Sequence, residues 1–549
     1  MKIKKLKEIF IKNSTEIILF IFALSFSIWL MFSTFSYSNG SMLIASKAWS
    51  DFASQIPLIR SFSFGHNFPP QHPLFPGPPI HYHFLFYAFV GLLEKLGVRI
   101  DYALNIPSAI GFFGLILMIY FFSKAIFKSK AVSILSVIFF LFNGSLSFIY
   151  FFTDHPMLQN FFTSLIQNNK FSSFGPYDNR IVSAFWNLNI YTNQRHLALS
   201  FALSLLIIII FLTPVIKKTK PKIKISLLLG AVLGLSFFLH FAVFLMTIIV
   251  LIMLSVFYPK LRTSGLVLLF TAAVISFPQY SYLQHSGGTF KSVFNPGYLI
   301  SNNLSFASFF NYWSANLGLN IILIPLGFIV APKNARKILI AFLPLFIVGN
   351  LIQFSPEIAA NHKFFNYFLI IGNMFSAFFI VYFWQKKFYL RPLLIVLIFL
   401  LIFSGIIDFF PISNDSKIAL ADYPQNKDIA WIMKNTLPNS IFLNSQFLYD
   451  PASMAGRKIF LGWPYFAWSE GYDTNTRGDI MKLIMTENDQ GKACLLLKNN
   501  NIRYVEVNSL QADPNLPTYS NLYLSVLSKE YVSNNGTYFI INVKDNCKK

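Results

Sequence analysis

The chain has 549 residues, of which 55% are hydrophobic, 18% aromatic and only 12% charged, and its mean hydropathy is +0.54. Soluble chains carry about 25% charged residues, so the composition argues against a soluble enzyme, a disordered protein and a nucleic-acid-binding domain. The net charge is +22, but residues 412–549 hold 14 Lys/Arg against 13 Asp/Glu, so the excess lies in the apolar part. Basic residues that flank apolar runs set membrane topology rather than bind a polyanion. The composition predicts an integral membrane protein.

Apolar segments recur along the first three quarters of the chain. The first, residues 17–35, is too long for a signal peptide and is followed by no small-residue cleavage site, so it predicts a retained span. Run 225–257 is long enough for a hairpin of two short spans, with His240 near its tip. The remaining runs lie at 104–123, 131–152, 196–216, 263–283, 313–331, 338–355, 364–384 and 391–411. Together these segments predict eleven spans.

Basic residues cluster in short gaps between the predicted spans, and these gaps set the orientation. The positive-inside rule places such gaps in the cytoplasm. Residues 81–97 then predict an amphipathic helix on the outer surface, because a full crossing there would move the next basic gap outside. We expect a multi-pass protein of the cytoplasmic membrane, with its N-terminus inside and its C-terminal part outside. The gaps lie at 124–130, 217–224, 260–262, 333–337 and 386–391.

Two domains are predicted, and the fold class is mainly α. Residues 1–411 form the transmembrane domain, with outer loops at 36–103, 153–195 and 284–312. Residues 412–549 read as a small extracytoplasmic α/β domain. In it, helical patterns at 428–437 and 476–500 alternate with strand patterns at 440–445, 457–462, 502–509 and 537–543.

The two cysteines, Cys494 and Cys547, both lie in this predicted tail domain. Two cysteines are too few for a disulfide framework or a cysteine-rich metal site. Two free thiols are the preferred interpretation, and a disulfide is the alternative if the domain faces an oxidising compartment.

Acidic residues are scarce in the membrane domain. Between Asp101 and Asp408 there are three, and Asp51 lies earlier, in the first outer loop. The predicted topology places all four at or beyond the outer ends of spans, with no carboxylate inside a span. Coupled transporters carry carboxylates within their spans, so this distribution favours chemistry at the outer membrane face. The three are Asp154, Asp178 and Glu357.

Asp51 lies on a predicted helix along the membrane surface, opposite apolar positions that recur with helical spacing. A solvated loop acid is the alternative interpretation. Basic side chains at the outer ends of spans are unusual, and they are suited to bind a lipid phosphate, with Arg donating two parallel hydrogen bonds. For each of them, snorkelling toward headgroups is the alternative, and His240 is alternatively a hydrogen-bonded polar residue. The candidate substrate- and phosphate-binding residues are Arg60, His81, His83, Arg180, Arg195, His196, His240, Glu357, His362 and Lys363.

The order of these features resembles the GT-C superfamily of membrane glycosyltransferases. A first span, a long outer loop with an early acid, a Pro-rich stretch, a non-spanning helix and a second acid after the third span occur in sequence. Four stretches are similar to uncharacterised bacterial members of that superfamily. They are WSDFASQIPLIRSFSFG, PGPPIHYHFLFYAFVGLLEKLG, SPEIAANHKFFNYFL and GRKIFLGWPYFAWSEGYDTNTR.

This resemblance implies roles for particular residues. Asp51 would be the catalytic carboxylate, either as general base on the acceptor or as a metal ligand, as in the oligosaccharyltransferase branch. Asp154 would be the second acid, although His155 and Pro156 stand where the family has its D-x-D partner, which leaves a divalent metal possible but no cofactor certain. The implied donor is a polyprenyl-phosphate-linked sugar, and the acceptor is a lipid, a glycan or a protein. The implied phosphate ligands are Arg195, His362 and Lys363.

Two other classes of function stay open at this stage. A transporter or flippase of lipid-linked sugars is one, and a non-catalytic membrane scaffold with the same fold is the other. The aromatic stretch GWPYFAWSEGYDTNTR in the tail suits stacking on sugar rings or docking on the membrane domain, and docking is the preferred interpretation.

Overall fold

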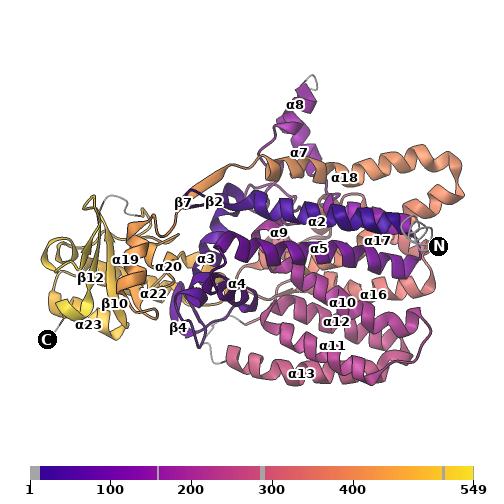
Figure 1. The fold of residues 1–549 in the computed structure, drawn as a ribbon. Helices are drawn as coiled ribbons and strands as arrows, with labels where there is room; N and C mark the ends of the chain where they lie inside the picture. Colours follow the sequence, from indigo (N-terminus) through magenta and orange to yellow (C-terminus); the bar gives the residue numbers. More distant parts are fainter. Residues whose placement is uncertain (1–12, 157–159, 285–290, 510–512, 548–549) are drawn as a thin grey trace, which may run out of the picture.

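Long parallel and antiparallel helices form one part of the molecule, and a mixed sheet lies at one end of them (Figure 1). This computed structural model describes residues 13–156, 160–284, 291–509 and 513–547. The described N-terminal helix begins at the end of the helices farthest from the sheet (Figure 1).

Seven of the described helices are long and apolar enough to cross a membrane. A further pair, α14 (Phe306–Leu317) and α15 (Asn320–Val330), meets at 81° and forms an eighth, bent span if it is counted as one. These helices account for seven or eight of the eleven predicted spans. The seven are α2 (Ser14–Thr34), α5 (Ile100–Phe127), α10 (Leu197–Ile216), α13 (Arg262–Gln284), α16 (Lys333–Leu351), α17 (His362–Lys386) and α18 (Arg391–Ser413).

The remaining predicted spans form shorter apolar helices. The run 131–152 breaks after α6 (Lys130–Leu141), where Phe142 takes extended backbone, and a separate helix α7 (Ser147–Asp154) follows. The run 225–257 forms the predicted pair of helices, α11 (Ile223–Leu235) and α12 (Phe241–Phe257), with η4 (Ser236–Phe238) between them. His240 has extended backbone at this break, so the chain reverses where the sequence predicted a tip.

Two glycines let α11 lie close against α13. A Cβ at Gly230 would come within 2.5 Å of the carbonyl oxygen of Leu268, and one at Gly234 within 2.9 Å of that of Ala272. Small residues four apart allow such close approach of helices in membranes. The pair of short helices is therefore packed firmly against its long neighbour.

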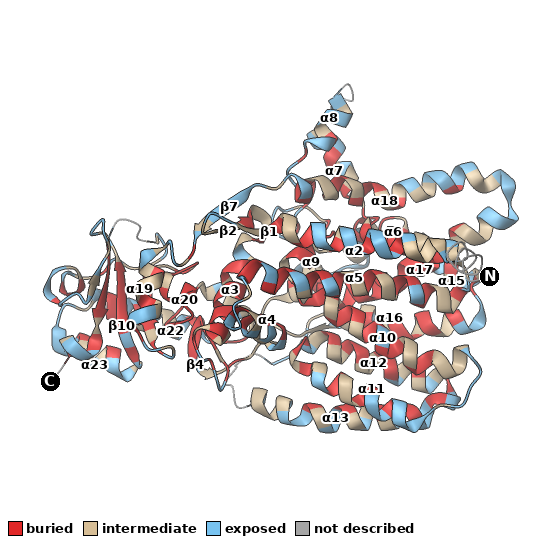
Figure 2. Cartoon of the chain, in the orientation of Figure 1, coloured by how far each residue is buried: buried red, intermediate tan, exposed pale blue. Residues whose placement is uncertain are grey.

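Burial follows the arrangement of the helices. Side chains of α17 are buried along most of its length, whereas α13 and α18 present exposed apolar side chains outward (Figure 2). The prediction that spans contain no carboxylate is wrong at two positions. Glu16, in the first turn of α2, binds Lys124 and Lys130, and Asp408 lies buried within α18. The two lysines satisfy Glu16, whereas one buried carboxylate oxygen of Asp408 has no hydrogen-bond partner among the described residues.

The first outer loop folds into short elements at the same end as the tail sheet. They include α3 (Trp49–Ser63), which is the predicted helix that carries Asp51, and α4 (Leu85–Lys95) within the predicted amphipathic segment. Two short strands, β3 (Gln71–His72) and β4 (Phe75–Pro79), lie between these helices. Helices α3 and α4 are too short to be among the long apolar helices.

A three-stranded sheet joins this loop to the segment after the last helix. Strand β2 (Ser41–Ala45) pairs antiparallel with β1 (Phe35–Ser38) on one side and with β7 (Lys417–Ala421) on the other. Beside the sheet, the Asp415 carboxylate accepts hydrogen bonds from the Ser46 hydroxyl at 2.6 Å and the Lys47 ammonium at 2.9 Å. The chain therefore returns to its first outer loop before it enters the tail.

The tail contains a five-stranded mixed sheet, with the strand order β11-β12-β10-β8-β9. The predicted helices and strands are confirmed, and the sheet adds β11 (Tyr531–Val532) at its edge. The others are β8 (Ile441–Leu443), β9 (Lys458–Ile459), β10 (Ile502–Asn508) and β12 (Tyr538–Asn542), with α19 (Lys427–Asn435), α20 (Pro451–Met454), α21 (Pro464–Ser469), α22 (Thr474–Thr486) and α23 (Gln490–Asn499).

Cys494 and Cys547 form a disulfide, so the preferred interpretation as two free thiols is wrong. The two residues are 53 positions apart in sequence. Helix α23 packs beside the end of the chain, where Lys498 donates to the carbonyl oxygen of Cys547, and this packing brings the sulfurs together.

Candidate functional site

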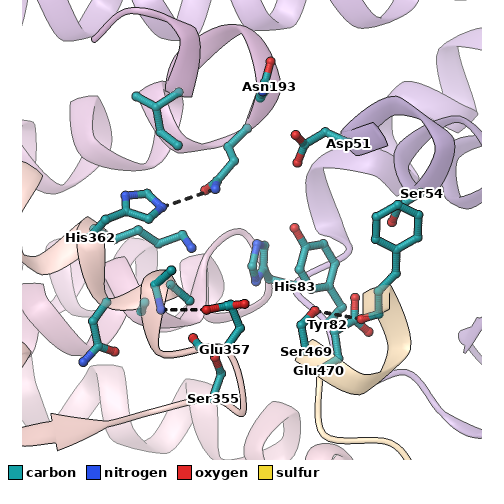
Figure 3. A pocket seen from close by; sticks show the side chains of 18 of the residues that line it. Asp51, Ser54, Tyr82, His83, Asn193, Ser355, Glu357, His362, Ser469 and Glu470 are labelled. Carbon is teal, nitrogen blue, oxygen red and sulfur yellow. Dashed lines mark hydrogen bonds between the residues drawn. The ribbon is translucent and has the colours of Figure 1, made fainter. Parts of the chain in front are cut away.

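A cavity of about 720 Å³ lies between the ends of the long helices and the tail domain. Its walls come from α3, the segment before α4, the turn after α9 (Asn189–Asn193), the start of α17 and helix α21 of the tail. Figure 3 shows Asp51, His83, Glu357 and Glu470 around this space, projecting from separate parts of the chain. Of the sequence-predicted residues, the cavity is lined by Asp51, His81, His83, His240, Glu357, His362 and Lys363.

Asp51 is presented by the first turn of α3, where the helix dipole favours a carboxylate. The side chain is partly buried at the cavity wall, and this desolvation raises the pKa of the carboxyl group to about 6. The Lys363 ammonium and a hydrogen bond with Asn193 oppose the shift, because both favour the charged form. Asp51 is thus poised to exchange a proton near neutral pH.

Lys363 lies in the first turn of α17, next to His362, and both side chains line the cavity. The His362 ring stacks on Phe185, with ring centroids 4.4 Å apart, and its two ring nitrogens contact the amides of Gln194 at 3.4 Å and Asn366 at 3.1 Å. These partners fix the imidazole in one orientation. Lys363 is therefore the cationic group of the pair that can reach a ligand.

Glu357 marks the opposite wall and contacts the tail. One carboxylate oxygen accepts a hydrogen bond from the backbone N–H of Ala359 at 2.9 Å, and the other accepts one from the Tyr465 hydroxyl at 2.9 Å. Tyr465 belongs to α21, so the tail domain closes this side of the cavity.

The aromatic stretch of the tail both docks and lines the cavity. Arg477 donates to the carbonyl oxygen of Pro76, and the Tyr472 hydroxyl contacts the backbone of Pro79 and of His81 in the first outer loop. The preferred interpretation as a docking segment agrees with these contacts. Side chains of the same stretch also line the cavity, namely Trp463, Tyr465, Phe466, Ser469 and Glu470.

Three histidines meet at one side of the cavity. The Nε2 atoms of His83 and His196 are 2.7 Å apart, and the His83 ring stacks on that of His240 with ring centroids 4.3 Å apart. His83 and His240 line the cavity, whereas His196 lies behind them with no exposed surface. Desolvation lowers the pKa of His83 well below its usual value, so its imidazole is neutral.

Asp154 and Arg180 lie away from the cavity. The Arg180 guanidinium donates two hydrogen bonds to the Asp154 carboxylate, at 2.8 and 2.9 Å, and both side chains are about one-third exposed. The two side chains pair with each other rather than with a ligand in the cavity, because a bidentate geometry satisfies the carboxylate and the guanidinium together. The resemblance implied that Asp154 acts as the second acid. The structure instead places Asp154 outside the cavity that Asp51 lines.

Arg195 has no exposed surface and is bound on every side by the protein. Its guanidinium donates to the carbonyl oxygen of Thr192 at 2.6 Å, the Thr34 hydroxyl at 2.7 Å and the Asn105 side chain at 3.1 Å. A guanidinium with these partners holds α2, α5 and the start of α10 together. We do not include Arg195 among the residues of the cavity.

Arg60 is likewise fully buried and lies outside the cavity. It donates to both oxygens of Asp422, at 2.6 and 2.7 Å, and to the carbonyl oxygen of Met454 at 2.9 Å. Its Nε lies 3.4 Å from the Glu94 carboxylate. The predicted phosphate ligand is thus a structural cation that ties α3 to α4 and to the segment after the last span.

The structure does not bring Asp51 and Asp154 together as ligands of the divalent metal that the resemblance left possible. Among the described residues, no group of three or more His, Cys, Asp and Glu side chains with closely spaced ligand atoms includes Asp51 or Asp154. Because Asp154 is held by Arg180 instead, we derive no catalytic step from a metal bound by these two acids.

Several cavity residues were not among the sequence candidates. Asn193 and Gln194 directly precede the predicted Arg195–His196 pair, and Tyr82 lies between two predicted histidines. Their nearness to predicted residues was the available signal, but polar uncharged side chains at span ends are too common to single out. Glu470 comes from the tail, whose position over the cavity depends on tertiary contacts.

The long helices, with a cavity at one end under a mixed-sheet tail, define a GT-C-like membrane fold. Over most of its length the chain is similar in structure to mycobacterial AftD and, with lower scores, to archaeal AglB, both GT-C membrane glycosyltransferases. The likeness to AftD confirms the predicted resemblance at the level of fold. No family model matches the chain, and no curated protein matches its sequence.

The similarity to arabinofuranosyltransferase AftD from mycobacteria has a TM-score of 0.56 at 12% identity, covering 95% of this chain and 40% of AftD. The chain thus spans well under half the length of that protein. The oligosaccharyltransferase of Archaeoglobus fulgidus, solved with a tethered acceptor peptide, matches with a TM-score of 0.47 at 12% identity, covering 97% of this chain and 74% of that one. The same organism's AglB, in complex with an inhibitory peptide and a dolichol-phosphate, gives 0.43 at 13% identity, with 97% and 74% covered.

Proposed function

We propose that the chain is a membrane glycosyltransferase that moves a sugar from a polyprenyl-phosphate-linked donor to an acceptor at the outer face of the cytoplasmic membrane. The observation that carries this proposal is the pairing of a poised carboxylate, Asp51, with the Lys363 cation in one cavity at the helix ends. The GT-C-like fold supports it independently.

Two features support an outward-facing cavity. The basic gaps of the sequence lie at the other end of the helices, where Lys124 and Lys130 bind Glu16 near the N-terminus and Lys337 donates to the carbonyl oxygen of Phe257. Basic gaps face the cytoplasm by the positive-inside rule. The disulfide of the tail suits an oxidising compartment.

A direct displacement accounts for the arrangement. The acceptor hydroxyl oxygen attacks the anomeric carbon of the sugar, and Asp51 takes the hydroxyl proton as the new C–O bond forms. The bond from the anomeric carbon to the phosphate oxygen breaks, and its electron pair leaves with the lipid phosphate. Lys363 stabilises the charge that develops on this phosphate. Donor and acceptor supply all atoms of the products, and no nucleotide is needed.

The proton-accepting role of Asp51 predicts a pH dependence. Because burial raises the pKa of Asp51 to about 6, the base form dominates above pH 6 and is lost below it. We expect the transfer rate to fall about tenfold per pH unit below pH 6. Burial raises the pKa of Tyr82 and Tyr449, so both phenols stay neutral in this range.

The measurement is the initial rate of transfer between pH 4.5 and 8, with thermal unfolding recorded at each pH. A rate that is flat from pH 5 to 7, in protein that stays folded, would contradict the assignment of Asp51 as base.

The phosphate-binding role of Lys363 is tested by Lys363→Met, which keeps the length of the side chain and removes its charge. We expect transfer from a labelled polyprenyl-phosphate sugar to drop at least about 100-fold, because a fixed cation at a developing anion contributes several kcal/mol. The matched control is Lys386→Met, at the far, exposed end of the same helix; its transfer rate should equal that of the wild type.

These experiments use the full-length protein in lipid bilayers and follow the labelled sugar. Absence of any transfer, together with movement of the labelled lipid between leaflets, would replace the proposal by a flippase. Transfer that is unchanged in Lys363→Met would place the phosphate elsewhere.

A further inference from the structure

The three histidines at the cavity wall come from three separate parts of the fold. His83 precedes α4, His196 precedes α10, and His240 lies at the break before α12. Each offers a ring nitrogen, and these nitrogens all lie within 4.8 Å of one another. In the described part of the chain, no other group of His, Cys, Asp or Glu side chains places three possible metal ligands this close together.

Hydrogen bonding alone leaves this cluster incomplete. His83 and His196 share one contact between their Nε2 atoms, and the Nδ1 of His196 contacts the Tyr87 hydroxyl at 2.8 Å. His240 is only 2% exposed, and neither of its ring nitrogens has a hydrogen-bond partner. A buried polar atom without a partner is costly, so the unpartnered imidazole points to a ligand between the three rings.

We propose that His83, His196 and His240 form a site for a divalent transition-metal ion of the zinc class. Neutral imidazole nitrogens suit Zn²⁺ and its neighbours rather than Mg²⁺ or Ca²⁺, which prefer oxygen ligands. Zinc–nitrogen bonds of about 2.0–2.1 Å in a tetrahedral site place ligand nitrogens about 3.4 Å apart. The contact of 2.7 Å between His83 and His196 then widens slightly. The His240 ring, which is stacked on His83 with an interplanar angle of 13°, turns out of the stack so that its nitrogen lone pair points at the ion.

The surroundings of the cluster fit this assignment. The Tyr87 hydroxyl contacts the nitrogen of His196 that faces away from the site, which is where a second group orients a metal-binding imidazole. Burial disfavours protonated imidazole, so the rings are available as ligands. The positive charge of Lys363 disfavours a further cation at the cluster, and the negative charge of Asp51 in the same cavity opposes this effect.

The position of the site leaves one coordination position open. His83 and His240 both line the cavity, and three protein ligands leave a fourth tetrahedral position for water or an oxygen of a bound ligand. Figure 3 shows His83 between Asp51 and Glu357. The metal would therefore meet whatever occupies the cavity, although its binding does not depend on the proposed glycosyltransferase activity.

The test measures metal binding by the purified full-length protein, without donor or acceptor. After treatment with a chelator, Zn²⁺ is added and its stoichiometry and affinity are measured by calorimetry and elemental analysis. We expect one Zn²⁺ per chain, and Co²⁺ in its place should give the visible absorption of a tetrahedral nitrogen site. His83→Gln and His240→Gln should each weaken Zn²⁺ binding by about 100-fold or more, and Tyr87→Phe by about 10–100-fold.

His362→Gln is the matched control, because His362 is equally buried and lines the same cavity outside the cluster. Its affinity for Zn²⁺ should equal that of the wild type. If His240→Gln does not fold, His83→Gln decides, because His83 is partly exposed to the cavity on a segment outside the helices. Wild-type protein that binds no stoichiometric Zn²⁺, or variants that bind it unchanged, would overturn the site and leave the tests of Asp51 and Lys363 unaffected.

Discussion

Asp51→Asn is expected to lower the rate of sugar transfer by about 10²–10⁴-fold, the usual contribution of a general base. Asparagine matches aspartate in size but cannot accept the acceptor's proton. Since burial already raises the pKa of Asp51 to about 6, the wild-type structure holds the carboxylate at some cost. The variant should therefore fold and insert as well as the wild type.

The measurement compares initial rates of the two proteins in bilayers with a labelled lipid-phosphate sugar. Asp479→Asn, an exposed acid of the tail, serves as the matched control and should transfer at the wild-type rate. Asp154→Asn adds a second comparison, because the structure holds Asp154 in an exposed ion pair with Arg180. Full activity of Asp51→Asn would sink the proposed mechanism, and a large loss in Asp154→Asn alone would move the chemistry to that acid.

Arg60→Met should destabilise the protein by about 3–5 kcal/mol, because it leaves the buried carboxylates of Asp422 and Glu94 without their cation. Methionine replaces most of the apolar volume, so the loss reports the charge rather than a cavity. Thermal unfolding in detergent measures the loss of stability, and proteolysis of the tail then locates the first cleavage. The site of first cleavage should move to the segment around Asp422.

Arg180→Met is the matched control for this prediction. Arg180 also pairs with an acid, Asp154, but the two side chains are 32% and 39% exposed, and exposed ion pairs contribute about 0–1 kcal/mol. A stable Arg60→Met protein that has lost only donor binding would restore Arg60 as the phosphate ligand that its sequence position suggested.

The sequence was sufficient to predict the helical membrane domain, the hairpin at His240 and the mixed tail, because apolar length and periodicity report these directly. It did not predict that the run 131–152 breaks after Leu141, because apolar composition alone does not reveal such a break. Composition also does not show that an acid such as Asp408 lies buried within α18.

The candidate site was predictable only in part. Asp51, His362 and Lys363 reach the cavity as expected from their places at helix ends. Arg60 and Arg195 had similar sequence signals, but the partners that bind them are distant: Asp422 lies 362 positions from Arg60, and Thr34 lies 161 positions from Arg195. A sequence pattern cannot show whether a cation faces a ligand or a partner of this kind.

The three-stranded sheet and the Arg60–Asp422 pair have a consequence for biosynthesis. Strands β1 and β2 and helix α3 leave the ribosome early, but β7 is made much later, and Asp422 follows it at 362 residues after Arg60. At about 5–20 residues per second, that interval is roughly 20 to 70 s. During this interval, the sheet of β1 and β2 lacks its third strand. Arg60, on the helix that carries Asp51, lacks the Asp422 carboxylate. A nascent chain stopped before Lys417 would contain every long apolar helix and no complete cavity, so the site is assembled only after the last helix has been made.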